Sequence, residues 1–371
     1  STCEGGRFVL AGSHARLTSD TADVPFAYSS ARVRMLRQRM LSRADVERLL
    51  TAPSVQAGMR VLSDTEYASA IAAVGRSDDY ERVLSAELQR VYDFVASFAP
   101  QEELLKMWAA RFAFLGLKTL LKAGLQGQDV ADALLPAWMP VERGRLRQTV
   151  ERVLDDETEF ADEDTTDMQG LETYLSQAAK AAVEAYQRHQ APEEIDHSVD
   201  MRFQQYLLDL TESREATFLR DWVVRFADVT NLTAFVRFAV AKRPAESLGR
   251  ALLPGGSMSS ERVLEAYAVS EEAQERVEAL LQVLTNTPYA SLLTQGWRAY
   301  QEEGLLYGME RMADGFLREY LDSARHQPFG IGVVWSYLMA KEREVRLIRL
   351  ILAGKSAGMS ERQLRERIEH V

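Results

Sequence analysis

The feature that most constrains this sequence is an apolar pattern that occurs three times. In the first two copies the apolar residues are spaced four, four and three positions apart, which places them on one face of an α-helix. The copies contain Trp108, Trp222 and Trp335, at intervals of 114 and 113 residues. In the third copy Glu342 stands where the others have an apolar residue. A period held along the whole chain predicts a triplicated helical unit.

The sequence after each tryptophan also repeats. A basic residue follows 14 or 15 positions later, and five residues beyond it stands a glycine in two copies and a lysine in the other. These pairs are Lys122 and Gly127, Arg237 and Lys242, and Arg349 and Gly354. Agreement outside the apolar positions favours repetition over three unrelated helices.

The length of 371 residues suits two or three domains. We predict repeat units over residues 25–141, 142–257 and 258–371. We expect residues 1–24 to be a weakly ordered extension, since they lack the apolar core of a signal peptide. Runs of helical period occur throughout and no convincing run of alternating polarity is found, so the predicted fold class is all-α.

Local signals refine this outline. Ser42 and Ser259 each precede an acidic residue and a helical run, which is typical of helix N-caps. Two further helices are expected near Glu271–Thr285 and Leu305–Ala324. Residues 155–167 contain eight acids and no base, which predicts a solvated connection because like charges repel.

The composition excludes several classes of protein. A net charge of −11 argues against general nucleic-acid binding, which needs a basic surface. The single cysteine, Cys3, excludes an internal disulfide framework and indicates a reducing compartment. The longest apolar runs fall well short of the roughly 20 residues that cross a bilayer, so no transmembrane segment is predicted.

The most basic segment follows Phe26 and contains five arginines: Arg32, Arg34, Arg37, Arg39 and Arg43. Two interpretations are open. Their aliphatic stems could cover the edge of the core while the guanidinium groups stay in water. Alternatively, they could form a contact face for an acidic partner.

No catalytic, cofactor or metal site is predicted. The segment AGKSAG ends like a phosphate-binding loop, but Arg349 stands where that loop needs its first glycine. We therefore interpret Gly354 as a helix C-cap, with Lys355 near the negative end of the helix dipole. A GxGxxG pattern beginning at Gly330 fails at Trp335. The five histidines form no i, i+4 pair and lie far from the cysteine, which disfavours zinc.

Glu342 is the polar residue that the repeat singles out. It could form an exposed i, i+4 pair with Arg346, contributing a few tenths of a kcal/mol. Alternatively, a buried Glu342 paired with Arg346 or Arg349 would fix how the third unit meets its neighbours.

Four segments carry a resemblance to a known family: FAYSSARVRML, LGLKTLLKAGLQG, NLTAFVRFA with LLPGGSM, and PFGIGVVWSYLMAKEREVRLIRLILAGKSAGMSERQLRER. Over Phe26–Val371 the chain resembles the C subunit of bacterial and archaeal V-type (A-type) ATPases, whose eukaryotic counterpart is the d subunit. The resemblance implies a funnel of three similar helical domains with pseudo-threefold symmetry. It also implies structural roles for Lys122, Arg237 and Arg349.

The function implied by the resemblance is that of a non-catalytic central-stalk subunit without a cofactor. One copy would connect D- and F-type shaft subunits to the proteolipid ring on the cytoplasmic face of the membrane. It would transmit torque for ATP-coupled proton or sodium transport. The alternative is a free-standing helical adaptor that binds acidic proteins or an anionic membrane surface through Arg32–Arg43.

Overall fold

The computed structural model describes residues 26–75, 79–99, 102–128, 130, 135, 139, 141–155, 169–212 and 217–368. Within these residues the chain forms seventeen α-helices and one 3-10 helix and no strand, so the prediction of an all-α fold is confirmed. None of the helices in these ranges is both long and apolar enough to cross a membrane. The predicted extension and most of the acidic connection lie outside the described residues.

The three repeated patterns form the three long helices of the fold. These are α6 (Glu102–Leu125), α10 (Thr217–Val240) and α16 (Ile331–Ser356). Trp108 and Trp335 are fully buried and Trp222 almost so. Leu115, the last apolar residue of the first copy, is instead 54% exposed, because at that level α6 buries a different face, which packs against its own helix set.

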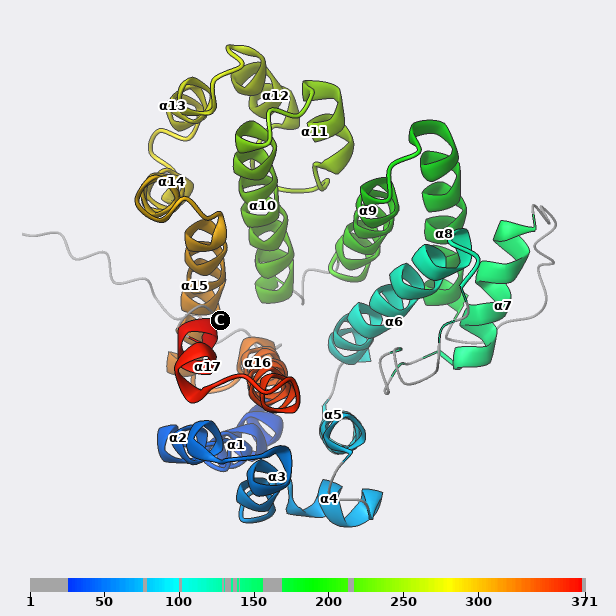
Figure 1. Cartoon of the computed structure of the whole chain (residues 1–371), viewed down its shortest axis with the longest axis vertical. Helices are drawn as coiled ribbons and strands as arrows, with labels where there is room; N and C mark the ends of the chain where they lie inside the picture. Colours follow the sequence, from blue (N-terminus) through cyan, green and yellow to red (C-terminus); the bar gives the residue numbers. More distant parts are fainter. Residues whose placement is uncertain are drawn as a thin grey trace, which may run out of the picture.

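Each long helix packs against its own set of shorter helices (Figure 1). Helix α6 contacts α7 (Arg143–Leu154), α8 (Gln169–His189) and α9 (Glu193–Leu210). Helix α10 contacts α11, α13, α14 and α15, and this part of the chain comprises α11 (Ala245–Ala251), α12 (Ser260–Ala268), α13 (Ala273–Val283), α14 (Pro288–Glu303) and α15 (Tyr307–Ser323).

The third set joins the two ends of the chain. Helix α16 contacts α17 (Glu361–Ile368), the 3-10 helix η4 (Ala324–His326) and several N-terminal helices. The N-terminal helices are α1 (Phe26–Arg37), α2 (Arg43–Thr51), α3 (Val55–Ser63), α4 (Ala68–Val74) and α5 (Tyr80–Ala96). The three sets lie around a common centre in Figure 1. The unit boundaries and the pseudo-threefold symmetry stay predictions.

The three long helices end in the same way. The backbone N–H of Gln128, Arg243 and Met359 donates to a carbonyl five residues back, at 2.9, 3.0 and 2.9 Å. The residue before each donor has a left-handed backbone: Gly127 (φ 65°), Lys242 (φ 50°) and Gly358 (φ 75°). This is the Schellman closure of a helix.

The C-cap predicted at Gly354 is therefore wrong. Helix α16 continues to Ser356, about one turn further than the repeat indicates. Gly354 is buried inside the helix, and a Cβ there would overlap Leu364 of α17. The glycine at this position is required by helix packing and not by a turn.

The local signals had mixed outcomes. Ser42 caps α2 in a reciprocal capping box with Asp45, and the Ser259 side chain caps α12, as predicted. Helix α14 was not predicted. Its signal is Pro288 at the first turn, where the missing N–H is not needed, followed by a left-handed Gly304 at the other end.

Candidate functional site

The three long helices meet at a junction formed by Arg111, Trp222, Trp335, Met339 and Glu342. The rings of Trp222 and Trp335 are packed edge to face, with centroids 5.1 Å apart. Arg111 of α6 pairs with Glu342 of α16 at 3.2 Å, and its Cζ lies 5.9 Å from the Trp222 ring centroid. One arginine thus connects all three helices by charge and by cation–π contact.

Glu342 is largely covered at this junction, with 15% of its side chain exposed. It pairs with Arg346 at 3.3 Å on its own helix and with Arg111 on α6. Arg349, the other partner considered from the sequence, instead pairs with Glu81 of α5 at 2.9 Å. Arg111 was missed because nothing in a single sequence indicates which residue of a distant helix faces Glu342.

The basic residues in the tails of the repeat share one geometry. Lys122 pairs with Asp196 of α9 at 2.7 Å, Arg237 with Glu310 of α15 at 2.7 Å, and Arg349 with Glu81 of α5. Each long helix is therefore linked to a neighbour in its own set at a similar position. These pairs are half-exposed, so each contributes about 0–1 kcal/mol and mainly orients the helices.

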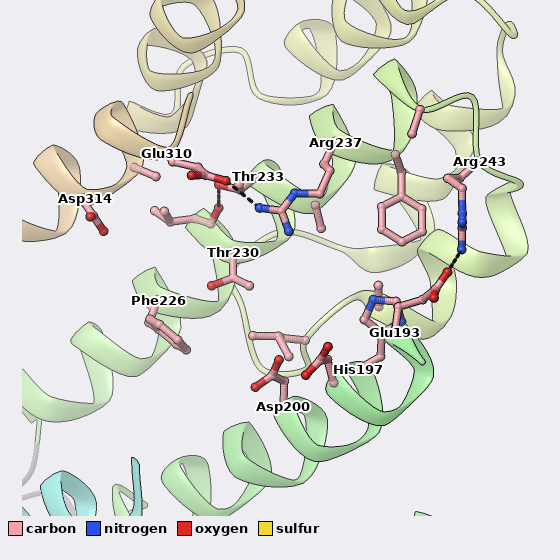
Figure 2. Close-up of a pocket in the computed structure, with 18 of the residues that line it drawn as sticks. Glu193, His197, Asp200, Phe226, Thr230, Thr233, Arg237, Arg243, Glu310 and Asp314 are labelled. Carbon is pink, nitrogen blue, oxygen red and sulfur yellow. Dashed lines mark hydrogen bonds and ion pairs between the residues drawn. The ribbon is translucent and has the colours of Figure 1, made fainter. Parts of the chain in front are cut away.

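A cavity of 610 Å³ lies between α9, α10 and α15 (Figure 2). Lys118 of α6 is also among the residues that line it. One face of α10 contributes apolar and hydroxyl side chains, including Phe226, Thr230 and Thr233. The charged residues of the lining are largely paired: Arg237 with Glu310, Arg243 with Glu193, and Lys118 with Asp200 at 2.6 Å. The cavity is thus lined by apolar side chains together with charges that are largely paired.

His197 of α9 also lines this cavity. Its Nδ1 atom is buried, and no hydrogen-bond partner for it is found among the described residues. Burial lowers the pKa of His197, although Glu194 and Asp200 oppose this shift. The imidazole ring packs beside the Phe238 ring, with the two centroids 5.9 Å apart, and so forms part of the apolar lining of the cavity.

The five arginines of the first helical segment contact different elements. Arg34 donates to the Gln327 carbonyl, and Arg37 donates to the Ser336 hydroxyl at 3.1 Å. Arg39 pairs with Glu66 at 3.4 Å, and Arg32 lies over the Phe94 ring at 4.8 Å. Arg43 is exposed at the start of α2. Arg34 thus holds α1 against the segment before α16, and Arg37 holds it against the first turns of α16.

A buried charged cluster was not anticipated from the sequence. Lys341 lies between Glu87 of α5 and Glu344, at 2.7 and 2.8 Å, and all three side chains are almost fully buried. Glu344 also accepts hydrogen bonds from Tyr67 and from the backbone N–H of Leu41. In the sequence, Lys341 and Glu344 belong to the charged run KEREVR, which suggests a solvated face.

The phosphate-loop-like segment has a structural role. Lys355 donates to the carbonyls of Leu50, at 2.8 Å, and of Ala52, and so joins the end of α16 to the end of α2. Across the described part of the chain, no three His, Cys, Asp or Glu residues are grouped so as to hold a metal ion.

Comparison with known proteins gives a consistent result. The sequence pattern of the ATP synthase (C/AC39) subunit matches residues 29–367. The chain is 23% identical over 359 residues to the C subunit of the A-type ATP synthase of Methanocaldococcus jannaschii, covering 92% of this chain and 85% of the relative. It is 25% identical over 335 residues to the C subunit of the V-type sodium ATPase of Enterococcus hirae, covering 90% and 94%.

Proposed function

The chain belongs to the ATP synthase (C/AC39) subunit family, and from this premise we propose that it connects the rotor shaft of a V/A-type ATPase to the membrane proteolipid ring. Family membership makes it a structural subunit of a rotary ATPase and not a catalytic one. The proposed place is peripheral, on the cytoplasmic face, with one copy per complex. The proposed role is torque transmission for ATP-coupled proton or sodium transport.

The junction of the three long helices supports this role. A part that transmits torque must resist relative movement of its segments, and tightly packed interiors deform little. Arg111, Trp222 and Glu342 join α6, α10 and α16 where the three helix sets meet. The match over residues 29–367 carries the proposal, and the junction gives it a physical basis.

We place part of the seat for the shaft at the cavity between α9, α10 and α15. Helices from two of the three sets line it, so a partner held there would contact both sets at once. Its apolar side chains offer area to bury and its charged pairs offer polar contacts, a combination also found in protein–protein interfaces.

Cross-linking tests this seat in the assembled complex. In a Cys3→Ser background, Thr230→Cys carries a cysteine on the cavity wall and Arg298→Cys carries one on the exposed face of α14. We expect a short bifunctional reagent to join Thr230→Cys, but not Arg298→Cys, to a shaft subunit. Equal cross-linking of the two variants, or none to the shaft, would refute the placement.

Co-purification tests the function itself. Affinity capture of the chain from native membranes should recover shaft and proteolipid subunits by mass spectrometry, and the isolated chain should lack ATPase activity. The alternative adaptor has less support, because Arg34 and Arg37 are engaged within the chain. Salt-sensitive flotation of the isolated chain with anionic liposomes, together with no recovery of rotor subunits, would favour the adaptor.

A further inference from the structure

Four arginines from different helical elements gather where α1, α15, η4 and α16 meet. We refer to Arg37, Arg318, Arg325 and Arg343 as the arginine cluster. Helix α16 packs against α1, α15 and η4, so the four side chains belong to one contiguous seam of the fold. Residues 37 and 343 are separated by most of the chain, and only the packing of its two ends brings them together.

The acids of this seam neutralise only part of the charge. Asp322 pairs with Arg325 at 3.3 Å and lies 3.9 Å from Arg37, and Asp314 acts on Arg343 from α15. Four guanidinium groups thus face Asp314 and Asp322, and with Glu319, which lines the second cavity beside Arg318, an excess of at least one positive charge remains. Such an excess stands out in a chain whose net charge is −11.

Two of the four arginines keep their donors unused. Among the described residues, neither Arg318 nor Arg343 forms a hydrogen bond or an ion pair. Arg318 is exposed, whereas Arg343 is partly buried. Burial lowers the pKa of Arg343, and the neighbouring Arg318 and Arg37 lower it further. Like charges are therefore held together here with too few counterions, and a bound anion would relieve their repulsion.

We propose that the arginine cluster binds a phosphoryl dianion, the terminal group of a phosphomonoester or inorganic phosphate. A phosphoryl group carries between one and two negative charges and three acceptor oxygens near neutral pH, so it can engage several guanidinium groups at once, which a single carboxylate cannot. Planar guanidinium forks donate pairs of hydrogen bonds to phosphoryl oxygens, and Arg318 and Arg343 have such donors free. This site lies beyond the proposed coupling function and does not depend on it.

A second cavity adjoins this cluster and leaves room for the rest of a ligand. Its volume is 680 Å³, and Arg318 and Asp314 are among its lining residues, together with Ser291 and Gln295 of α14. A phosphomonoester could place its phosphoryl group among the arginines and its remaining atoms in this cavity.

Titration calorimetry of the full chain with inorganic phosphate, at constant ionic strength, tests the proposal. Loss of one charge-assisted hydrogen bond should weaken phosphate binding about tenfold or more in Arg343→Gln and in Arg318→Gln. The exposed Arg318→Gln is not expected to disturb folding, which circular dichroism checks. The control Arg262→Gln removes the same charge from the exposed surface of α12, which does not line the second cavity, and it should bind like the parent.

Flotation with vesicles that contain phosphatidic acid separates two sources of the group. Vesicle binding that is lost in Arg318→Gln assigns the site to a lipid headgroup, and phosphate binding without vesicle binding assigns it to a free phosphate compound. The proposal is overturned if the parent binds neither, if Arg262→Gln weakens binding as much as the cluster variants, or if a glutamate-rich peptide binds there and phosphate does not.

Discussion

Replacing Lys341 with methionine should be among the most destabilising single changes in this chain. The ammonium group contacts Glu87 and Glu344 at 2.7 and 2.8 Å and lies 4.3 Å from the centroid of the Tyr67 ring. Glu87 keeps a two-fold hydrogen bond from Arg90 after the change, at 2.7 and 2.9 Å. Among the residues that the structure describes, Glu344 then keeps only neutral donors, Tyr67 and the Leu41 N–H.

The magnitude follows from this arrangement. With Lys341 gone, the cluster of Lys341, Arg90, Glu87 and Glu344 changes from balanced to one excess negative charge in a buried site. Breaking a buried ion pair in this way costs about 3–5 kcal/mol. Adding Glu344→Gln to Lys341→Met restores the balance, so the double variant should be more stable than the single one.

Urea unfolding at neutral pH, followed by far-ultraviolet circular dichroism, gives the free energies of unfolding. The matched control is Lys106→Met, which removes a partly exposed i, i+4 pair with Glu102 and should change stability by no more than about 0.5 kcal/mol. A loss below about 1 kcal/mol for Lys341→Met, or no recovery in the double variant, would refute the assignment of a buried, mutually compensating cluster.

Three further changes test the junction and the cavity. Trp222→Ala should lower the free energy of unfolding by about 3–5 kcal/mol in the same urea assay, since it empties a core site; a loss well under 1 kcal/mol would show that its packing is wrongly assigned. Glu342→Gln should cost about 1–3 kcal/mol because Arg111 loses a covered carboxylate, whereas the control Arg346→Gln removes only an exposed pair; equal effects would contradict this. Because the folded state holds His197 neutral, stability should fall as the pH drops below about 6.5 towards its lowered folded-state pKa, and His197→Gln should reduce that fall; an unchanged pH profile would contradict it.

Features written locally in the sequence were predictable. The all-α class and the three long helices follow from periodicity around Trp108, Trp222 and Trp335, and the caps at Ser42 and Ser259 follow from short-range hydrogen bonding. These signals depend on neighbours in the sequence, so one chain is enough to read them.

Features set by packing between distant segments were not predictable. Arg111 faces Glu342 across 231 residues, and α16 packs on helices from the opposite end of the chain. In the sequence, Lys341 and Glu344 are part of a charged run that predicts a solvated face. In the structure they are buried, and Lys341 pairs with Glu87 of α5. The sequence pattern predicts which face of each helix is apolar, but it does not predict which helices pack against each other. Both the junction and the arginine cluster depend on that packing.

The most direct test of the proposed coupling role is to measure ATP hydrolysis and ATP-driven ion uptake together, in vesicles reconstituted with the complete complex or with a complex lacking this chain. We predict that the depleted complex hydrolyses ATP but transports no ions, and that adding the purified chain restores transport. Ion uptake per ATP that is the same with and without the chain would contradict the account.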